Sequence, residues 1–256
     1  MTNFVHIIPL GLEKDRNIYL LKKFPPNKVY FINYKVEHDI DKEYKKLQEP
    51  IRKELDSLIS LAEKKYMYVS YEDFEEMFLT IFDIMVKEKK RGNEVIAHVF
   101  GPRMSAFAAW LAASITNSKG YYIRSSSYGP HGERLDFTSS VKLIDLIKLP
   151  VIIPNALQAV FLENLLENKG SISGSLRSFV EKIGIEKFGK IKSINSAIVS
   201  MSHCVRELKR EQFITVKSIS RKRQRVEITQ LGKLTAKSYK ILKENKFDLN
   251  SINGKA

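Results

Sequence analysis

The chain has little of what several large classes of protein depend on. Its only cysteine, Cys204, excludes an internal disulfide and falls among the apolar positions of a predicted helix, so we expect it in the core. The most apolar windows, 106–115 and 149–160, are too short or too interrupted to cross a bilayer. The first residues lead directly into a predicted strand rather than a signal peptide. We therefore expect a cytoplasmic protein with no membrane partner.

The sequence also lacks the groupings that mark metal and catalytic sites. Five histidines are scattered without nearby cysteines or paired carboxylates, so we expect no metal site and no required cofactor. No Ser/His/Asp or paired-carboxylate arrangement is evident. Arg124 and His131 have six residues between them, but Gly129 and Pro130 in that interval would break the helix on which such a pair must converge. We assign no catalytic residue and expect a protein that is not an enzyme.

Positive charge is abundant and unevenly distributed. The net charge of the 256 residues is +14; residues 151–256 hold 20 Lys and Arg against 9 Asp and Glu, a net of +11, and residues 1–150 hold only +3. Such a concentration is typical of a domain that binds a polyanion. The length suffices for two domains that each bury a core. We predict domains at 1–150 and 151–246, followed by a flexible polar tail at 247–256.

The first predicted domain alternates strands and helices. Apolar runs indicate strands at 4–10, 29–32, 66–69, 95–100 and 120–124. Helical spacing indicates helices around 18–21, in a region where Pro50 lies near the start of the longer segment, at 73–90 and at 105–115. This alternation predicts the α/β class, with a Rossmann-like parallel sheet covered on both faces. Residues 125–132 indicate a polar loop, and 135–149 fits either a hairpin strand or a closing helix.

Two loops at strand ends are the candidate ligand site of this domain. In an open α/β sheet, ligands bind beyond the carboxyl ends of the strands, and a glycine followed by a helix N-terminus suits a phosphate. The loops after the first and fourth predicted strands have this form. The candidate ligand-binding residues are Gly11, Asp15, Arg16, Gly101, Pro102, Arg103, Met104 and Ser105. Both loops also fit the simpler interpretation of connectors, with Asp15 and Arg16 as a surface pair.

The second domain is predicted to hold three helices and a hairpin. The helices cover 156–167, 176–183 and 194–208; strands at 212–216 and 226–229 flank the segment Lys217–Arg225, which has five cations and no acidic residue, and a helix follows. Helix, strand, basic turn, strand and helix is the order of a winged helix-turn-helix domain, which binds double-stranded DNA. Residues 184–192 are long for the turn before the third helix, and fit either phosphate contacts from their lysines or an extra helical turn.

Two sets of residues are candidates for DNA contact. Small polar groups on the face of the third helix opposite its apolar side suit base edges, and the cations of the hairpin, called the wing below (Lys217–Arg225), suit phosphates. The alternative is an ordinary solvated face and loop. The candidate DNA-binding residues are Asn195, Ser196, Ser200, His203, Arg206, Arg221, Lys222, Arg223 and Arg225.

Three segments carry a resemblance to a known family. They are VHIIPLGLEKDR at 5–16, GPRMSAFAAWLA at 101–112 and VEITQLGKL at 226–234. With these, the chain resembles the archaeal CRISPR-associated Rossmann fold (CARF) regulators that carry a C-terminal winged helix. The resemblance implies a homodimer with one pocket across its two-fold axis, where a cyclic oligoadenylate binds and alters DNA binding. By position, the ligand loops would be 11–16 and 101–105. Many members have Gly-Thr-Lys in the second loop, where this chain has Gly101, Pro102 and Arg103.

Three functions remain open on the sequence alone. The first is a dimeric transcriptional regulator whose DNA binding depends on a cyclic nucleotide. The second is a ring nuclease that cleaves the cyclic oligoadenylate. The third is a ligand-independent DNA-binding protein whose α/β domain only dimerises.

Overall fold

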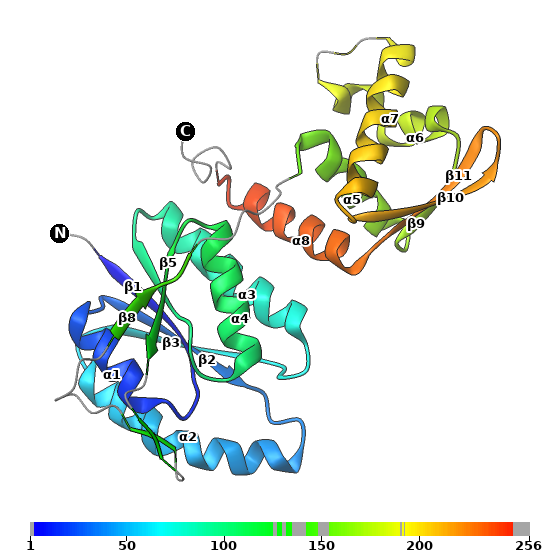
Figure 1. Cartoon of the computed structure of the whole chain (residues 1–256). Coiled ribbons are helices and arrows are strands. Elements are labelled where there is room, and N and C mark those ends of the chain that lie inside the picture. Colours follow the sequence, from blue (N-terminus) through cyan, green and yellow to red (C-terminus); the bar gives the residue numbers. More distant parts are fainter. Residues whose placement is uncertain are drawn as a thin grey trace. The chain divides into compact units, whose positions relative to one another are not determined.

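The computed structural model describes residues 3–124, 127–129, 132–134, 142–147, 154–189, 191 and 193–247. Contacts divide the chain into two compact units, one of Met1–Val151 with Glu244–Ala256 and the other of Ile152–Lys243 (Figure 1). Of the polar tail predicted at 247–256, all but Phe247 lies outside the described residues.

The first unit is built on a six-stranded sheet with the strand order β3-β2-β1-β4-β5-β8. Its five parallel strands confirm the prediction of a Rossmann-like α/β fold. An antiparallel strand, β8, closes the edge beside β5. The bounds are β1 Phe4–Pro9, β2 Lys28–Tyr34, β3 Glu63–Val69, β4 Glu94–His98, β5 Lys119–Arg124 and β8 Lys142–Asp145.

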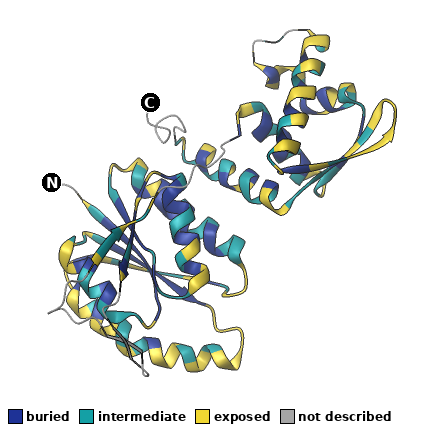
Figure 2. Cartoon of the chain, viewed as in Figure 1, coloured by how far each residue is buried: buried dark blue, intermediate teal, exposed yellow. Residues whose placement is uncertain are grey.

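Four helices cover the sheet of the first unit: α1 Lys14–Lys23, α2 Asp39–Leu58, α3 Phe74–Lys90 and α4 Arg103–Ile115. Ile8 and Phe31 of the sheet pack with Leu21 of α1 and Leu55 of α2. Helices α3 and α4 pack against each other and against β4. Because successive residues of a strand point to opposite faces, buried neighbours such as Ile7 and Ile8 need cover on both sides. Figure 2 shows the central strands β1, β2 and β4 as mostly buried and α2 as mostly exposed.

Two expectations for the first unit are wrong. Pro50 does not begin a helical segment but lies inside the continuous helix α2, where the proline costs one backbone hydrogen bond and the rest of the helix persists. The segment predicted as a polar loop at 125–132 includes two short paired strands, β6 Ser127–Gly129 and β7 Gly132–Arg134. In the segment 135–149, the structure describes 142–147, of which 142–145 form β8; the rest of that segment lies outside the described residues.

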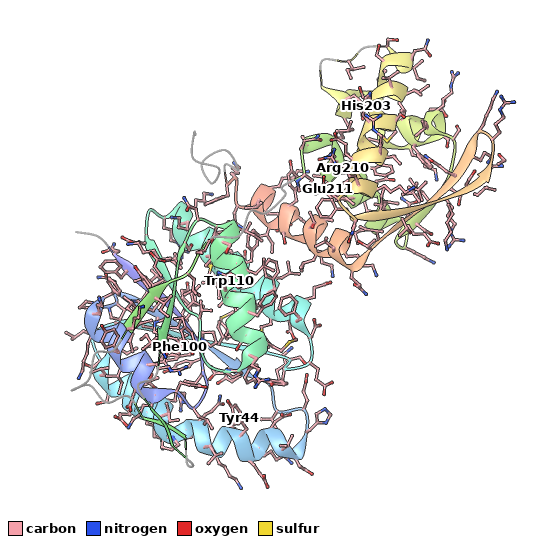
Figure 3. All side chains as sticks on the ribbon, in the orientation of Figure 1. Tyr44, Phe100, Trp110, His203, Arg210 and Glu211 are labelled. Carbon is pink, nitrogen blue, oxygen red and sulfur yellow. The ribbon has the colours of Figure 1, made fainter. Side chains whose placement is uncertain are left out.

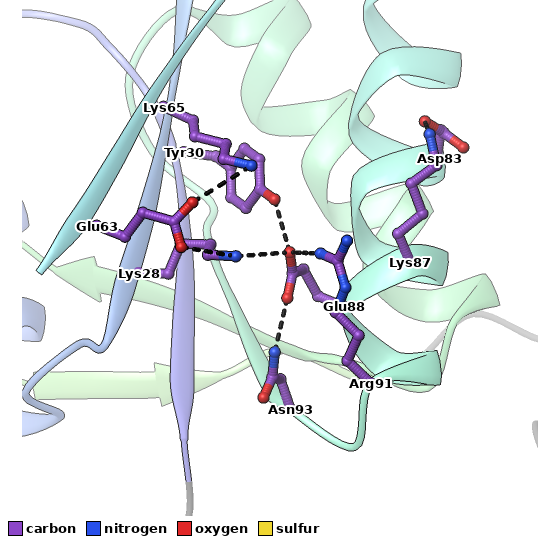
Figure 4. A network of polar contacts seen from close by, with 9 residues as sticks. All are labelled: Lys28, Tyr30, Glu63, Lys65, Asp83, Lys87, Glu88, Arg91 and Asn93. Atoms are coloured by element: carbon purple, nitrogen blue, oxygen red, sulfur yellow. Dashed lines mark hydrogen bonds and ion pairs between the residues drawn. The ribbon is translucent and has the colours of Figure 1, made fainter.

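A buried carboxylate joins the amino end of β2 to the end of α3 (Figure 4). Glu88 is fully buried and accepts hydrogen bonds from Tyr30 Oη at 2.6 Å, Asn93 Nδ2 at 2.6 Å and Arg91 Nη1 at 2.5 Å, with Lys28 Nζ at 3.3 Å. Burial alone would raise the pKa of this carboxyl, but the hydrogen bonds and the two cations lower it below its ordinary value. Glu88 therefore stays ionised and fixes this end of the sheet.

In the described residues of the second unit there are four α-helices, a short 3₁₀ helix and a three-stranded antiparallel sheet in the order β10-β11-β9. The elements are α5 Ala156–Glu167, β9 Ser171–Gly174, α6 Leu176–Ile183, η1 Ile185–Phe188, α7 Ile194–Arg210, β10 Ile214–Ser220, β11 Arg223–Ile228 and α8 Gln230–Glu244. The core includes Phe161, Phe179, Met201 and Val226. Cys204 is buried, as expected.

One feature of the second unit differs from the sequence prediction, and another settles a choice between two alternatives. Strand β9 was not predicted; it has a single buried apolar side chain, Ile172, and depends on its pairing with β11. The long segment at 184–192 holds the extra helical turn, η1, which buries Phe188. Lys190 and Lys192 lie outside the described residues.

Candidate ligand site and candidate nucleic-acid interface

The two loops singled out in the sequence lie side by side at the carboxyl edge of the first sheet. Strand β1 pairs with both β2 and β4, so the strand order reverses at this position. A Cβ atom at Gly11 would lie 2.9 Å from Gly101 Cα and 2.9 Å from Pro102 Cδ. Gly101 has φ +106, and a Cβ atom there would lie 2.9 Å from the carbonyl oxygen of Pro9. Only glycine allows the loops to approach so closely.

The second loop is held to the end of β2 through a serine. Ser105 is buried, and its hydroxyl donates to the carbonyl oxygen of Pro102 at 2.9 Å. Tyr34 Oη donates in turn to Ser105 Oγ at 2.8 Å. Burial raises the pKa of Tyr34, so its phenol keeps its proton. Ser105 therefore orders the first turn of α4, while Arg103 and Met104 beside it are exposed.

A cavity of about 680 Å³ lies beside this loop. Gly101, Pro102 and Arg103 line it, together with residues from the end of β2, the start of α2 and the segment after β3. One of these is Tyr44, which projects from α2 (Figure 3) and whose pKa burial raises to about 12. The remaining lining residues are Tyr34, Lys35, Glu37, His38, Ile40, Asp41, Lys45, Gln48, Tyr71 and Glu72.

Arg16 lies in a different environment from the one that its place in the first loop indicated. It is only 5% exposed, on α1, and its guanidinium carbon is 6.0 Å from the ring centre of Phe100 and 5.3 Å from that of Tyr122. A guanidinium over aromatic faces contributes to packing. Asp15 is half-buried in the first turn of α1. The structure thus brings Gly101, Pro102 and Arg103 to the cavity and places Arg16 among aromatic rings.

A chain of buried hydrogen bonds runs beneath the two loops, and the sequence analysis missed it. His6 Nδ1 lies 2.8 Å from His98 Nε2, and His98 Nδ1 lies 2.7 Å from Asn17 Oδ1. Asn17 Nδ2 donates to the carbonyl oxygen of Glu13 at 3.1 Å, which fixes the orientation of the amide. His98 Nδ1 must then carry a proton, so its Nε2 accepts from His6 Nδ1. The chain links the sheet interior to the first loop.

Both imidazoles of this chain are fully buried, and burial keeps them neutral. Burial lowers the pKa of His6 to about 4. Burial, and secondarily the proximity of His6, places the pKa of His98 well below its ordinary value. No single position signals this pair in the sequence, because the two histidines meet only through the adjacency of β1 and β4. Among the described residues, no group of three or more His, Cys, Asp or Glu could hold a metal ion.

The surface of α7 in the second unit has the two faces expected from its sequence. The buried side includes Ala197, Met201 and Leu208. The candidate contact residues Asn195, Ser196 and His203 are exposed, and Ser200 is half-buried. Two further side chains matter to this surface: Val199 is 57% exposed, and Arg206 is exposed and contacts His203 Nδ1. Arg210, labelled in Figure 3, forms an ion pair with the adjacent Glu211.

The wing is a longer hairpin than the sequence analysis expected. Lys217 lies on β10, and Arg223 and Arg225 lie on β11, so only Arg221 and Lys222 occupy the turn. Glu227 forms ion pairs with Arg225 at 2.7 Å and with Lys217 at 3.9 Å. The ion pairs within the part of the chain that the structure describes include none with Arg221, Lys222 or Arg223, and all three are exposed. These three residues form the uncompensated charge of the wing.

Comparisons with known proteins give one family match. A family model described as "HFX_2341_N:-like, N-terminal" matches residues 4–128, just under half of the chain, which covers the elements from β1 to β5. No curated protein matches the chain. No helix among the described residues of either unit is long and apolar enough to cross a membrane.

Two solved structures show a distant likeness. The first is Enterococcus italicus Csm6 bound to cyclic hexa-2′-fluoro-hexa-dAMP, with 10% identity and a TM-score of 0.40 over 83% of this chain and 56% of that one. The second is protein VC1899 from Vibrio cholerae, with 10% identity and a TM-score of 0.35 over 94% of this chain and 65% of that one. The match therefore spans less than two thirds of either structure. At these identities and scores, the two likenesses set no function for this chain.

Proposed function

We propose that the protein is a dimeric DNA-binding regulator. In this proposal the second unit is a winged helix-turn-helix domain, and the Rossmann-like unit binds a nucleotide such as a cyclic oligoadenylate. The order of helices and strands in the second unit supports the first part of the proposal, because it agrees with that fold. The cavity beside 101–103 and the glycine contact between the loops support the second part. The proposal assigns no catalytic activity to the protein. Cleavage of a cyclic oligoadenylate by the purified protein would contradict this part of the proposal.

One observation supports DNA binding above the others. The wing exposes Arg221 and Lys222 in its turn and Arg223 at the start of β11, while Glu227 offsets the cations further along both strands. Cations at a hairpin tip are positioned to lie against phosphates, and the exposed polar face of α7 suits base edges. Phosphate contacts supply affinity and salt dependence, whereas base contacts supply sequence preference.

The proposal is tested by duplex DNA binding over a range of salt concentrations. The probe is duplex DNA from the promoter region of the protein's own gene, and binding is followed by fluorescence anisotropy. Replacing Arg221, Lys222 and Arg223 by alanine should weaken binding to all sequences and reduce the slope of log K against log salt by about 0.9 for each phosphate that the wing no longer neutralises. The control replaces the exposed Lys22, Lys23 and Lys90 of the first unit by alanine and removes the same charge. Equal losses in the two variants would contradict a contact by the wing.

The sensing part has a separate test. A ligand shifts DNA affinity only if it binds one state of the protein more tightly than the other. DNA binding is therefore titrated with and without cyclic tetra-adenylate and cyclic hexa-adenylate. A changed affinity that is lost in Arg103→Ala would support the ligand site, while equal affinities at every salt concentration would remove sensing. Sedimentation analysis that finds a monomer would contradict the dimer.

A further inference from the structure

A second, larger cavity lies along α2, at the carboxyl ends of β2 and β3. Its volume is about 970 Å³, and we call it the α2 groove. It shares Tyr34, Lys45 and Gln48 with the cavity beside the second loop, so the two are neighbours, but none of residues 101–103 lines it. The lining residues are Leu10, Asn33, Tyr34, Val36, Lys42, Lys45, Lys46, Gln48, Glu49, Pro50, Arg52, Lys53 and Tyr68.

The charge of the α2 groove is strongly positive. Five of its lining residues are Lys or Arg and a single one, Glu49, is acidic. Arg52 Nη2 lies 2.6 Å from a Glu49 carboxylate oxygen, so that negative charge is already compensated. The ion pairs recorded for the described residues include neither Lys45 nor Lys46, and Lys42 has only the almost fully exposed Asp39 as its partner. Lys53 Nζ also lies 4.0 Å from a Glu49 oxygen. Lys45 and Lys46 are therefore the groove cations without an ion-pair partner among the described residues.

The spacing of these cations places them along one side of a helix. Lys45 and Lys46 come three and four positions after Lys42, and Lys53 comes seven positions after Lys46, or two helical turns. Helical residues three, four or seven positions apart lie on the same side of the helix. Like charges on one helix face repel each other and weaken an isolated helix. A row of lysines beside a cavity is stabilised when an anion occupies that cavity.

The groove also offers polar and aromatic contacts that a simple basic patch lacks. Asn33 and Gln48 line it, and both amides are buried. Gln48 Nε2 donates to the carbonyl oxygen of Leu10, which ties this part of α2 to the first loop. Tyr68 at the end of β3 is 55% exposed and Val36 is 41% exposed, so a ring and an apolar surface adjoin the lysines. Aromatic faces stack on nucleobases, and lysines bind phosphates.

We propose that the α2 groove binds a linear nucleotide carrying several phosphates, either a nucleoside triphosphate or the phosphorylated end of a short oligonucleotide. Lys45 and Lys46 hold the phosphates, and Tyr68 stacks on a base. The volume suits such a ligand, since small-molecule sites span roughly 300–1,000 Å³. The proposal does not depend on the DNA-binding role of the second unit. It adds a site to the one beside the second loop.

The test is isothermal titration of the full-length protein with three probes: ATP, inorganic tripolyphosphate and 5′-phosphorylated linear tri-adenylate. Replacing both Lys45 and Lys46 by alanine should weaken ATP and tripolyphosphate binding about tenfold or more. Tyr68→Ala should weaken ATP binding roughly fivefold to a hundredfold, because stacking is lost, and leave tripolyphosphate binding unchanged. Tighter binding of ATP identifies the free nucleotide as the ligand, and tighter binding of tri-adenylate identifies the oligonucleotide.

Two controls locate the site. Replacing Lys22 and Lys23 by alanine removes the same charge from exposed positions of α1 and should leave ATP affinity unchanged. Arg103→Ala alters the neighbouring cavity and should also leave it unchanged. The proposal would be overturned if neither ATP nor tri-adenylate bound. It would also be overturned by an equal loss in the Lys22 and Lys23 control, by a larger loss in Arg103→Ala, or by no effect of Tyr68→Ala on the nucleotide that binds. Duplex DNA binding is also measured for the Lys45 and Lys46 variant. Because the α2 groove and the DNA-binding surface are separate sites, failure of the groove proposal leaves DNA binding unchanged and is distinguished from failure of the regulator proposal.

Discussion

Lowering the pH from 7.5 to 5.0 should destabilise the first unit through its two buried histidines. In the folded protein, burial lowers the pKa of His6 to about 4 from an ordinary 6.5, and the pKa of His98 also lies well below 6.5. Below pH 6.5 the unfolded chain takes up protons that the folded chain does not. The stability linked to each neutral imidazole is therefore complete above pH 6.5 and is lost as the pH falls toward the folded pKa.

The size of this loss follows from the two pKa values of His6. Linkage between an unfolded pKa of 6.5 and a folded pKa of about 4 predicts a loss of about 2 kcal/mol in the free energy of unfolding between pH 7.5 and 5.0. His98 adds to the loss in the same direction. Ending the series at pH 5.0 keeps it above the range in which carboxyls with lowered pKa values, such as Glu88, lose their stabilising charge.

The assay is urea unfolding followed by the fluorescence of Trp110, the only tryptophan of the chain, which lies on α4 of the first unit. A variant with glutamine at both His6 and His98 should show a much flatter dependence of stability on pH. The control variant has glutamine at the exposed His38 and His203 and should keep the full dependence. Nitrogen NMR of the folded wild-type protein follows the titration of each imidazole directly and does not depend on whether the variants fold. An imidazole of His6 or His98 titrating near pH 6.5, or a stability unchanged at pH 5.0, would refute the reasoning.

Three other experiments test the remaining structure. Glu88→Gln leaves buried donors without their charged acceptor and should cost about 3 kcal/mol in urea unfolding, so a loss below about 1 kcal/mol would contradict the role of the network. Gly101→Ala combines a positive φ with a contact against the backbone and should cost about 3 kcal/mol, whereas Gly92→Ala, with φ +79 and open space, should cost about 1 kcal/mol; similar values would deny the loop contact. Alanine at Asn195 and His203 should change sequence preference by about tenfold in competition binding, and a uniform loss would place base contacts elsewhere.

The parallel strands of the first unit could be predicted from the sequence because each contains a short apolar or aromatic run, although charged residues begin β3 and β5. Strand β9 could not, since Ser-Ile-Ser-Gly has no strand pattern of its own and is ordered by β11. The continuity of α2 through Pro50 could not be predicted either. The low helix propensity of proline predicts a break there, whereas the packing of Leu55 in the core favours a continuous helix.

The candidate sites divide along a similar line. The glycines at 11 and 101 were placed at strand ends from the sequence, and the structure brings them into contact because the carboxyl ends of parallel strands share one edge of a sheet. The burial of Arg16 beneath Phe100 and Tyr122 depends on how α1 packs against the sheet, which local sequence does not contain. The lysines of α2 lie at helical spacing in the sequence, but the sequence does not show which surface they face.

Pro50 gives α2 unequal halves. It has no amide hydrogen for the carbonyl oxygen of Lys46, and the only buried side chains of the helix are Gln48 and Leu55. The stretch before the proline is held by Gln48, by the half-buried Tyr44 and by the cap at Asp41, and it has no fully buried apolar side chain. Deuterium should therefore enter its amides sooner than those around Leu55. Lys42, Lys45 and Lys46 thus lie on the less firmly packed part of the helix, where the backbone can adjust when an anion binds.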